Sequence, residues 1–325
     1  MASSPIPQPE HALILTRDLR RVITPGPVLR RQLRAGGMVR LRRGVYMTAQ
    51  AWALRDGDAR YRALVRGTAL EHPSDPVISH QSAAALWGLP ILGRWPSDVH
   101  VLAERASGGR SDPGVRRHAL GIDSADVAVL HGIRVTSLAR TVVDVAATST
   151  LHSAVATVDA AVHEPRYGTA RLTRTDLLEQ YDRMLPFRGS RRAREVIDFA
   201  EAGAASPRES ASRVTIALAG FPRPQLQRPF MVDGSEVFVD FYWAEADCIG
   251  ECDGDAKYLD PSMLGGRTPA EVVLAEKRRE DALRAQVSRF VRWEARLALD
   301  AASLTRKLTA AGLARTFAPS PLRGR

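Results

Sequence analysis

The chain has 325 residues, of which 45% are hydrophobic and 25% charged, and its formal net charge is +10. This length predicts two or three domains, and the composition is that of globular proteins rather than of disordered chains. No segment approaches the ~20 apolar residues that a membrane span needs. The first residues, MASSPIPQPE, lack the basic and apolar regions of a secretion signal. We therefore expect a cytoplasmic protein without a membrane partner.

The positive charge is concentrated at the N-terminus. Residues 1–50 contain nine arginines against Glu10 and Asp18, a net charge of +7. The arginine excess of a GC-rich genome would instead be spread evenly along the chain. A basic patch favours a polyanionic partner because it attracts phosphates, so we expect contact with double-stranded DNA.

Residues 1–50 have the pattern of a winged helix-turn-helix. One helix is predicted over residues 11–22, the run TPGPV breaks it, and a second helix is predicted over residues 27–35. Residues 38–46 then alternate as in a hairpin, with Arg40 and Arg42 facing solvent. In this motif the second helix enters the major groove, whereas the alternative is a helical cap coated with arginines. The candidate DNA-binding residues are Arg30, Arg31, Arg34, Arg40, Arg42 and Arg43.

Residues 51–200 are predicted to form a mixed α/β domain with no catalytic spacing. Ser79 and His80 are interpreted as a helix cap and a buried polar histidine, since adjacent helical residues point in different directions. A strand is expected at Val99–Ala103 and a polar, basic loop over residues 104–117. The predicted helices lie near residues 50–70, 79–87, 137–147, 150–163, 173–184 and 190–202.

The first 145 or so residues resemble the N-terminal region of the AbiEi-like antitoxins of type IV toxin–antitoxin systems, which are common in actinobacteria. The segments that carry the resemblance are RLRRGVY, ISHQSAAALWGLP and GIRVTSLARTVVDVAA. The resemblance implies a winged helix that binds operator DNA, and a toxin or operon partner. The run TPGPV departs from the usual pattern of the first helix.

Residues 203–296 are predicted to run helix, strand, strand, strand, helix, strand. Two capping boxes, with Glu209 and Glu271 at their third helical positions, begin the two helices. Asp233-Gly234 is the turn of a hairpin between the first two strands. Residues 297–325 are expected to form a C-terminal helix and a tail.

Acidic residues fall near the ends of these predicted strands. Asp240 lies near the end of one strand, Glu251 near the end of the next, and Asp253 two residues later. Carboxylates that converge on one edge can hold Mg²⁺, a hard cation that prefers oxygen ligands. Such an ion polarises a phosphate and activates a water. Lys257, one of only three lysines, would neutralise charge in the transition state.

The pattern Glu209, Asp240, Glu251-x-Asp253, Lys257 resembles the PD-(D/E)XK nuclease superfamily, and more narrowly its DUF559 and very-short-patch-repair-like branch. The segments VDFYWAEADCIGECDGDAKY and EKRREDALRAQVSRFVRW carry the resemblance. It implies a restriction-endonuclease-like domain in which Glu209 is the helix acid, Asp240 and Glu251 bind Mg²⁺ or Mn²⁺, and Asp253 is a further acid. Where the family has a lysine two residues after the glutamate, this chain has Asp253, and Lys257 stands later.

Each of these residues also has a structural interpretation. Glu209 completes a capping box, Asp240 fits a solvated edge strand, Glu251 and Asp253 could be turn residues, and Lys257 a surface lysine. No histidine follows His163, so the C-terminal region cannot use histidine-based nuclease chemistry on its own residues.

We therefore expect an α+β protein with three domains and a tail. These are a winged helix at 1–50, a mixed α/β domain at 51–200, and a restriction-endonuclease-like domain at 203–296, with 297–325 following. The expected function is Mg²⁺-dependent hydrolysis of DNA. The alternative is a non-enzymatic transcriptional regulator or antitoxin whose nuclease domain is degenerate and serves in homodimerisation or partner binding.

Overall fold

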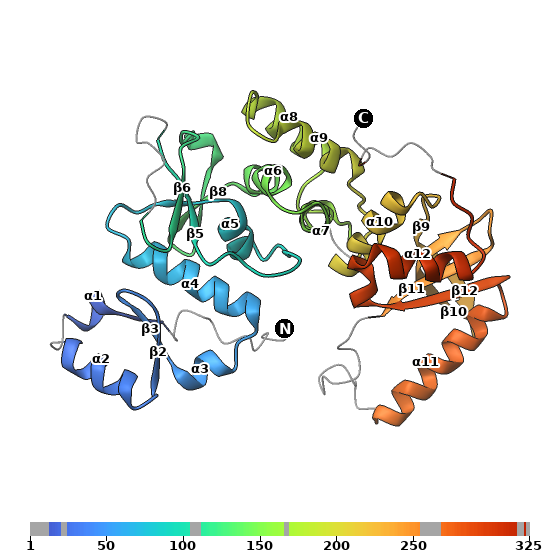
Figure 1. The fold of residues 1–325 in the computed structure, drawn as a ribbon, viewed down its shortest axis with the longest axis horizontal. Coiled ribbons are helices and arrows are strands. Elements are labelled where there is room, and N and C mark those ends of the chain that lie inside the picture. Colours follow the sequence, from blue (N-terminus) through green and yellow to red (C-terminus); the bar gives the residue numbers. More distant parts are fainter. Residues whose placement is uncertain are drawn as a thin grey trace. The chain divides into compact units, whose positions relative to one another are not determined.

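The computed structural model describes residues 13–20, 25–104, 112–165, 169–253, 268–316 and 322. The chain forms two compact units, Met1–Val145 and Ala146–Arg325. The boundaries expected near residues 50 and 200 therefore both fall inside a unit. The fold contains helices together with three sheets, one antiparallel and two of mixed strand direction, so the predicted α+β class is confirmed (Figure 1). Among the described residues, no helix has the length and apolarity to cross a bilayer.

The first unit begins with a three-stranded sheet in the order β1-β3-β2. The helix predicted over residues 11–22 is wrong in its first half, because residues 13–15 form a strand that pairs antiparallel with β3. That pairing places Leu15 beside Val45 in the core, a long-range contact that outweighs local helix propensity. The elements are β1 (Leu13–Leu15), α1 (Thr16–Leu19), α2 (Pro25–Arg34), β2 (Met38–Arg42), β3 (Val45–Thr48) and α3 (Ala49–Ala53).

The predicted hairpin is formed by β2 and β3, with a shift of register between Arg40 and Arg42. Val45 and Met47 point into the core, and Arg40 is exposed. The prediction that Arg42 also faces solvent is wrong. The irregularity turns Arg42 into a half-buried position, where burial lowers the pKa of its guanidinium.

A five-stranded sheet in the order β6-β5-β4-β8-β7 completes the first unit. Apolar side chains such as Val65, Ile78 and Val101 form its core. The predicted helices at 79–87 and 137–147 and the strand at Val99 are confirmed. The helix predicted at 50–70 is divided by residues 54–56 into α3 and a following helix, Gly57–Glu71. The expected loop over residues 104–117 ends in a strand, since Val115 is buried beside Val99. The elements are α4 (Gly57–Glu71), β4 (Val77–Ile78), α5 (His80–Trp87), β5 (Val99–Leu102), β6 (Val115–His118), β7 (Val127–Leu130), β8 (Ile133–Thr136) and α6 (Leu138–Thr148).

The second unit opens with three helices at the predicted places and continues in the predicted order. That order is helix, strand, strand, strand, helix, strand, and a C-terminal helix follows. The elements are α7 (Leu151–Val162), α8 (Arg174–Met184), α9 (Ser190–Phe199), α10 (Pro207–Ala219), β9 (Gln225–Val232), β10 (Ser235–Trp243), β11 (Cys248–Asp253), α11 (Pro269–Arg284), β12 (Arg289–Glu294) and α12 (Ala301–Ala310).

A four-stranded sheet in the order β12-β11-β10-β9 lies between two helical layers. β9, β10 and β11 are antiparallel neighbours, and β12 pairs parallel to β11 after the α11 crossover. One face packs Phe241 and Trp293 against α10 and α12. The other packs Ile249 against Leu283 of α11. Since Leu308 of α12 is buried in this core, the C-terminal helix belongs to the same unit.

Gly250 lies where two tryptophan rings leave no room for a side chain. A Cβ atom there would come within 2.8 Å of Trp243 Cζ3 and 2.9 Å of Trp293 Cη2. We expect Gly250→Ala to lower the free energy of unfolding by about 1–3 kcal/mol, because rigid rings must shift to accept the methyl group. Chemical denaturation followed by tryptophan fluorescence measures this. Gly203→Ala is the control, since its Cβ would make only ordinary contact with Leu226. Equal stabilities of the two variants would contradict the packing.

Candidate functional site

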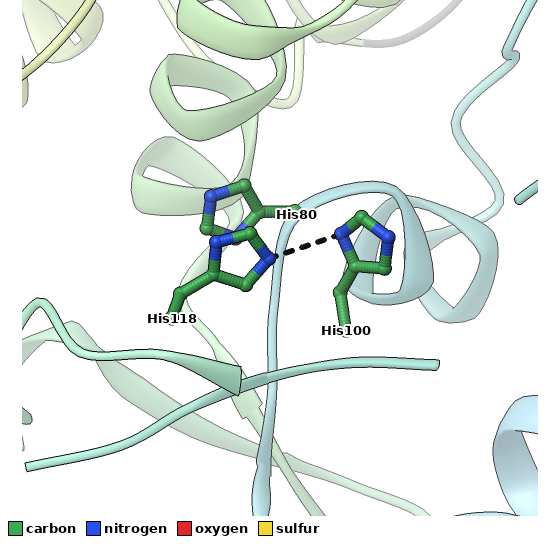
Figure 2. A group of neighbouring side chains, drawn as sticks. All are labelled: His80, His100 and His118. Atoms are coloured by element: carbon green, nitrogen blue, oxygen red, sulfur yellow. Dashed lines mark hydrogen bonds between the residues drawn. The ribbon is translucent and has the colours of Figure 1, made fainter. Parts of the chain in front are cut away.

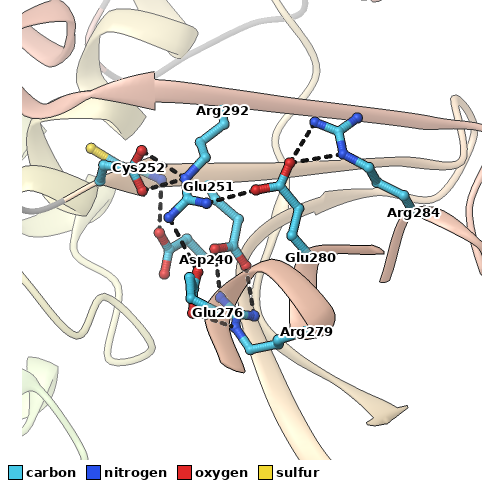
Figure 3. A network of polar contacts seen from close by, with 9 residues as sticks. Asp240, Glu251, Cys252, Glu276, Arg279, Glu280, Arg284 and Arg292 are labelled. Carbon is cyan, nitrogen blue, oxygen red and sulfur yellow. Dashed lines mark hydrogen bonds and ion pairs between the residues drawn. The ribbon is translucent and has the colours of Figure 1, made fainter. Parts of the chain in front are cut away.

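Three acidic residues from α10, β10 and β11 gather at one place in the second unit. Phe241 pairs with Gly250, so the antiparallel register sets Asp240 opposite Glu251 on neighbouring strands. The two side chains lie close together (Figure 3). Asp240 Oδ2 accepts a hydrogen bond of 2.8 Å from the backbone N–H of Cys252, which fixes the carboxylate against β11. The predicted placement of Asp240 and Glu251 on neighbouring strands is thus confirmed, whereas a separation short enough to share one ion stays a prediction.

Glu209 joins this group from the first turn of α10. The predicted capping box is formed only in part: the N–H of Glu209 donates to Ser206 Oγ at 3.2 Å, but the Glu209 carboxylate accepts from the N–H of Ala205 instead of that of Ser206. Its carboxylate accepts hydrogen bonds from Ser206 Oγ at 2.8 Å, the N–H of Ala205 at 3.0 Å and Gln227 Nε2 at 3.1 Å. Burial and the negative charge of Asp240 raise the pKa of Glu209 to about 7, although the three hydrogen bonds to its carboxylate act in the opposite direction. The capping role and membership of the acidic group are thus combined in one residue.

Glu251 is buried, with 6% of its surface exposed, and its carboxylate is paired with an arginine. Arg279 of α11 donates to both carboxylate oxygens, at 3.2 and 2.7 Å (Figure 3). The pKa of Glu251 is raised to about 7, mainly by burial. Arg279 lowers this pKa, and the like charges of Asp240 and Glu276 raise it. Glu251 is therefore a buried strand residue with a raised pKa, not a solvated turn residue.

Asp253, at the position where the nuclease family has lysine, is paired with an arginine. Arg292 Nε lies 2.5 and 2.6 Å from the two carboxylate oxygens of Asp253. The same guanidinium reaches Glu280 at 2.7 Å and Glu276 at 3.1 Å on α11. Since Arg292 is also the neighbour of Glu251 in the β11–β12 register, a cation does lie beside Glu251, but it comes from another strand.

The predicted ligands do not form a three-residue metal cluster. Within the described part of the chain, one group of three histidine, cysteine, aspartate or glutamate side chains lies close enough together to share an ion. It consists of His80, His100 and His118, in the first unit. Asp240 and Glu251 remain as a pair of candidate ligands. Lys257 lies outside the described residues.

The expectation for Ser79 is corrected. Its side chain makes no capping hydrogen bond to α5, and Ser79 Oγ instead lies 3.0 Å from Nδ1 of His80. His80 is buried next to two other histidines, His100 and His118, which lie far from it in the sequence. The sequence carried no spacing signal for this group, because its members come from three separate elements.

Four of the six candidate DNA-binding arginines meet in the first unit. Arg30 of α2 and Arg40, Arg42 and Arg43 of the hairpin line one hollow of about 660 Å³, together with Arg20. Arg42 Nη1 is buried without a hydrogen-bond partner among the described residues. An unpartnered guanidinium nitrogen in a basic hollow favours an anionic ligand.

The other two candidates, Arg31 and Arg34, are exposed on α2 and do not line that hollow. Their place on the surface of the helix leaves them available for contact with a partner.

The pKa of Glu209 generates a prediction for stability against pH. Its carboxyl binds a proton more tightly in the folded chain, with a pKa of about 7 against an ordinary value of 4.5. Its contribution is therefore fully present below the ordinary pKa and is lost as pH rises through 7. We expect Glu209→Gln to reduce the fall in unfolding free energy between about pH 5 and pH 8 by on the order of 3 kcal/mol. Urea denaturation of both proteins across this range tests it, with the exposed Glu245→Gln as control. An unchanged slope in Glu209→Gln would contradict the assignment.

Comparison with known proteins places the chain among mycobacterial relatives. No family model matches it. The uncharacterized proteins MT2308 and Rv2248 of two Mycobacterium tuberculosis strains are each 31% identical to it over 245 residues, which covers 73% of this chain and 82% of theirs. The crystal structure of the RV2827C protein from M. tuberculosis aligns over 62% of this chain and 75% of its own, with 16% identity and a TM-score of 0.37, a likeness too low to support a shared fold. The chain belongs to the same family as MT2308 and Rv2248.

Proposed function

We propose that the chain is a DNA-binding endonuclease that hydrolyses phosphodiester bonds with Mg²⁺ or Mn²⁺. The observation that carries the proposal is the gathering of Glu209, Asp240 and Glu251, in which two carboxyls have pKa values raised to about 7. Buried acids with strongly perturbed pKa values are concentrated at functional sites. The order α10-β9-β10-β11-α11-β12, with β12 parallel to β11, also agrees with the restriction-type core implied by the sequence resemblance.

The residues present fit a hard divalent cation in ligand type and in charge. Asp240 and Glu251 offer the carboxylate oxygens that Mg²⁺ prefers. Their mutual repulsion, expressed in the raised pKa of Glu251, would be relieved by a cation between them. When bound, such an ion polarises the phosphate and lowers the pKa of a water. Arg279 occupies the oxygens of Glu251, so binding of the ion competes with this ion pair.

The chain's own residues supply the remaining functions. Glu209, with a pKa near neutrality, can take a proton from the attacking water onto its carboxylate. Arg292, held beside Glu251 by Asp253, supplies the positive charge that the family's lysine would place near the phosphate. The assignment of a similar role to Lys257 stays a prediction.

DNA binding is proposed for the first three-stranded sheet and α2, as a winged helix. The support is the hollow lined by Arg30, Arg40, Arg42 and Arg43, which suits backbone phosphates, next to the exposed Arg31 and Arg34 on α2. Phosphate contacts of this kind position a protein on the duplex without reading its sequence.

A second candidate function is a non-enzymatic regulator of the type IV antitoxin class, acting with a toxin partner or as a homodimer. The observation that favours it is the pairing of both residues of the Glu251-x-Asp253 motif with arginines, Arg279 and Arg292. In such a protein these ion pairs would replace the ion permanently and stabilise a binding domain.

Cleavage of plasmid DNA separates the two candidates. With Mg²⁺ or Mn²⁺, the wild-type protein should nick or cut the plasmid, and Asp240→Asn and Glu251→Gln should each lower the rate by about 100-fold or more, because each change removes a charge at the reacting phosphate. Glu245→Gln, an exposed carboxylate in the same unit, is the control for charge. Equal cleavage by wild type and Asp240→Asn would mean that a contaminant cuts. No cleavage on any DNA form with either metal would favour the regulator.

DNA affinity tests the winged helix independently of cleavage. Replacing Arg30, Arg31 and Arg34 with Ala should weaken duplex binding and reduce the slope of log K against log salt by about 0.9 for each phosphate that the variant no longer neutralises. The control replaces three exposed arginines of the second unit, Arg188, Arg191 and Arg194, which removes the same charge. If both triple variants bind alike in fluorescence anisotropy titrations, α2 is not the DNA-binding helix.

A further inference from the structure

Three histidines from three elements of the first unit meet at one point (Figure 2). His80 is the first residue of α5, His100 lies in β5, and His118 ends the neighbouring strand β6. One ring nitrogen of each lies within 4.8 Å of one ring nitrogen of the other two. His118 Nε2 and His100 Nδ1 are 3.2 Å apart, and the rings of His80 and His118 are stacked with centroids at 3.7 Å.

These imidazoles are in the form that binds metal ions. Burial lowers the pKa of His100 to about 3 and that of His118 to about 4, and it also lowers the pKa of His80 well below its ordinary value, with the nearby Arg116 adding to each shift. All three rings are thus neutral at physiological pH, and each keeps a nitrogen lone pair.

The surroundings of His80 hold its ring in one orientation. Its backbone has φ of +53°, a left-handed conformation that is unfavourable for a residue with a side chain. Nδ1 lies 3.0 Å from Ser79 Oγ and 3.8 Å from the Asp144 carboxylate, which Arg140 also binds. The Asp144 oxygen is beyond hydrogen-bonding distance of the ring, so Ser79 is the group that orients His80, and Asp144 adds negative charge nearby.

We propose that His80, His100 and His118 bind one divalent transition-metal ion of the zinc class. Imidazole nitrogens suit zinc, copper, nickel and iron rather than Mg²⁺, so this site differs in chemistry from the carboxylate pair of the second unit. Three protein ligands leave one position of a tetrahedral zinc for water. His118 is the one histidine of the three that is only partly buried, so solvent would reach the site beside it.

The site also ties together the edge of the five-stranded sheet. α5 and the strands β5 and β6 each supply one ligand. An ion bound by all three holds them only in the folded chain, so it stabilises the first unit by mass action. The charge of Arg116 opposes the ion, and the nearby Asp144 carboxylate offsets it.

The test uses the full chain, freed of any affinity tag and stripped of metal. Calorimetric titration with Zn²⁺ should show one equivalent bound, and thermal unfolding should move to higher temperature when Zn²⁺ is added. His118→Gln and His100→Gln should each weaken binding by at least about 100-fold, more than removal of an outer partner costs. His131→Asn is the matched control, because His131 is exposed in a turn at φ of +48°, a conformation that Asn tolerates.

The alternatives each give a different result. Co²⁺ bound by nitrogen ligands alone should show visible absorption without a thiolate charge-transfer band, and such a band would assign the ion to Cys248 and Cys252 and overturn the proposal. Undiminished Zn²⁺ binding by His118→Gln, or no binding by the wild type, would overturn it as well. Circular dichroism of the metal-free variants checks folding, and if His100→Gln does not fold, His118→Gln and the wild-type Co²⁺ spectrum decide.

Discussion

The burial of acidic side chains in the second unit is the constraint on which the rest of its structure depends. Glu209 and Glu251 are each only 6% exposed, and removing a charged carboxylate from water is costly unless partners replace its hydration. The chain replaces it with the capping hydrogen bonds of α10 and with Arg279 of α11. The same pairing therefore joins α11 to the sheet and leaves a group of acids whose charge is incompletely balanced.

This incomplete balance of charge is the feature of the structure that supports the proposed metal site. A purely structural ion-pair network would be expected to lower the pKa of its acids, whereas burial and Asp240 raise those of Glu209 and Glu251 to about 7. The ion pairs of Glu251 and Asp253 act in the opposite direction, since they satisfy the oxygens that a metal would bind. Which of the two proposed functions applies, nuclease or regulator, depends on which of these two effects prevails when a divalent ion is present.

Much of the second unit could be predicted from the sequence because its signals are local. The capping-box sequence patterns at Ser206 and Thr268 place two helices, and alternation places the strands, so Asp240 and Glu251 could be predicted on neighbouring strands. The pairing of Arg279 with Glu251 could not be predicted, since Arg279 follows Glu251 by 28 residues and its orientation depends on how α11 packs. In the first unit, the pairing of residues 13–15 with β3 and the meeting of three histidines depend on contacts between distant segments in the same way.

The most direct test of the account is whether a divalent ion displaces Arg279 from Glu251. Crystals of the wild-type chain soaked in Mn²⁺ should show an anomalous-scattering peak contacted by the carboxylates of Asp240 and Glu251, with the guanidinium of Arg279 moved off the Glu251 oxygens. Crystals of Asp240→Asn treated in the same way should lack the peak. An Arg279–Glu251 ion pair that stays intact at saturating Mn²⁺, with no peak at these carboxylates, would contradict the proposed metal site.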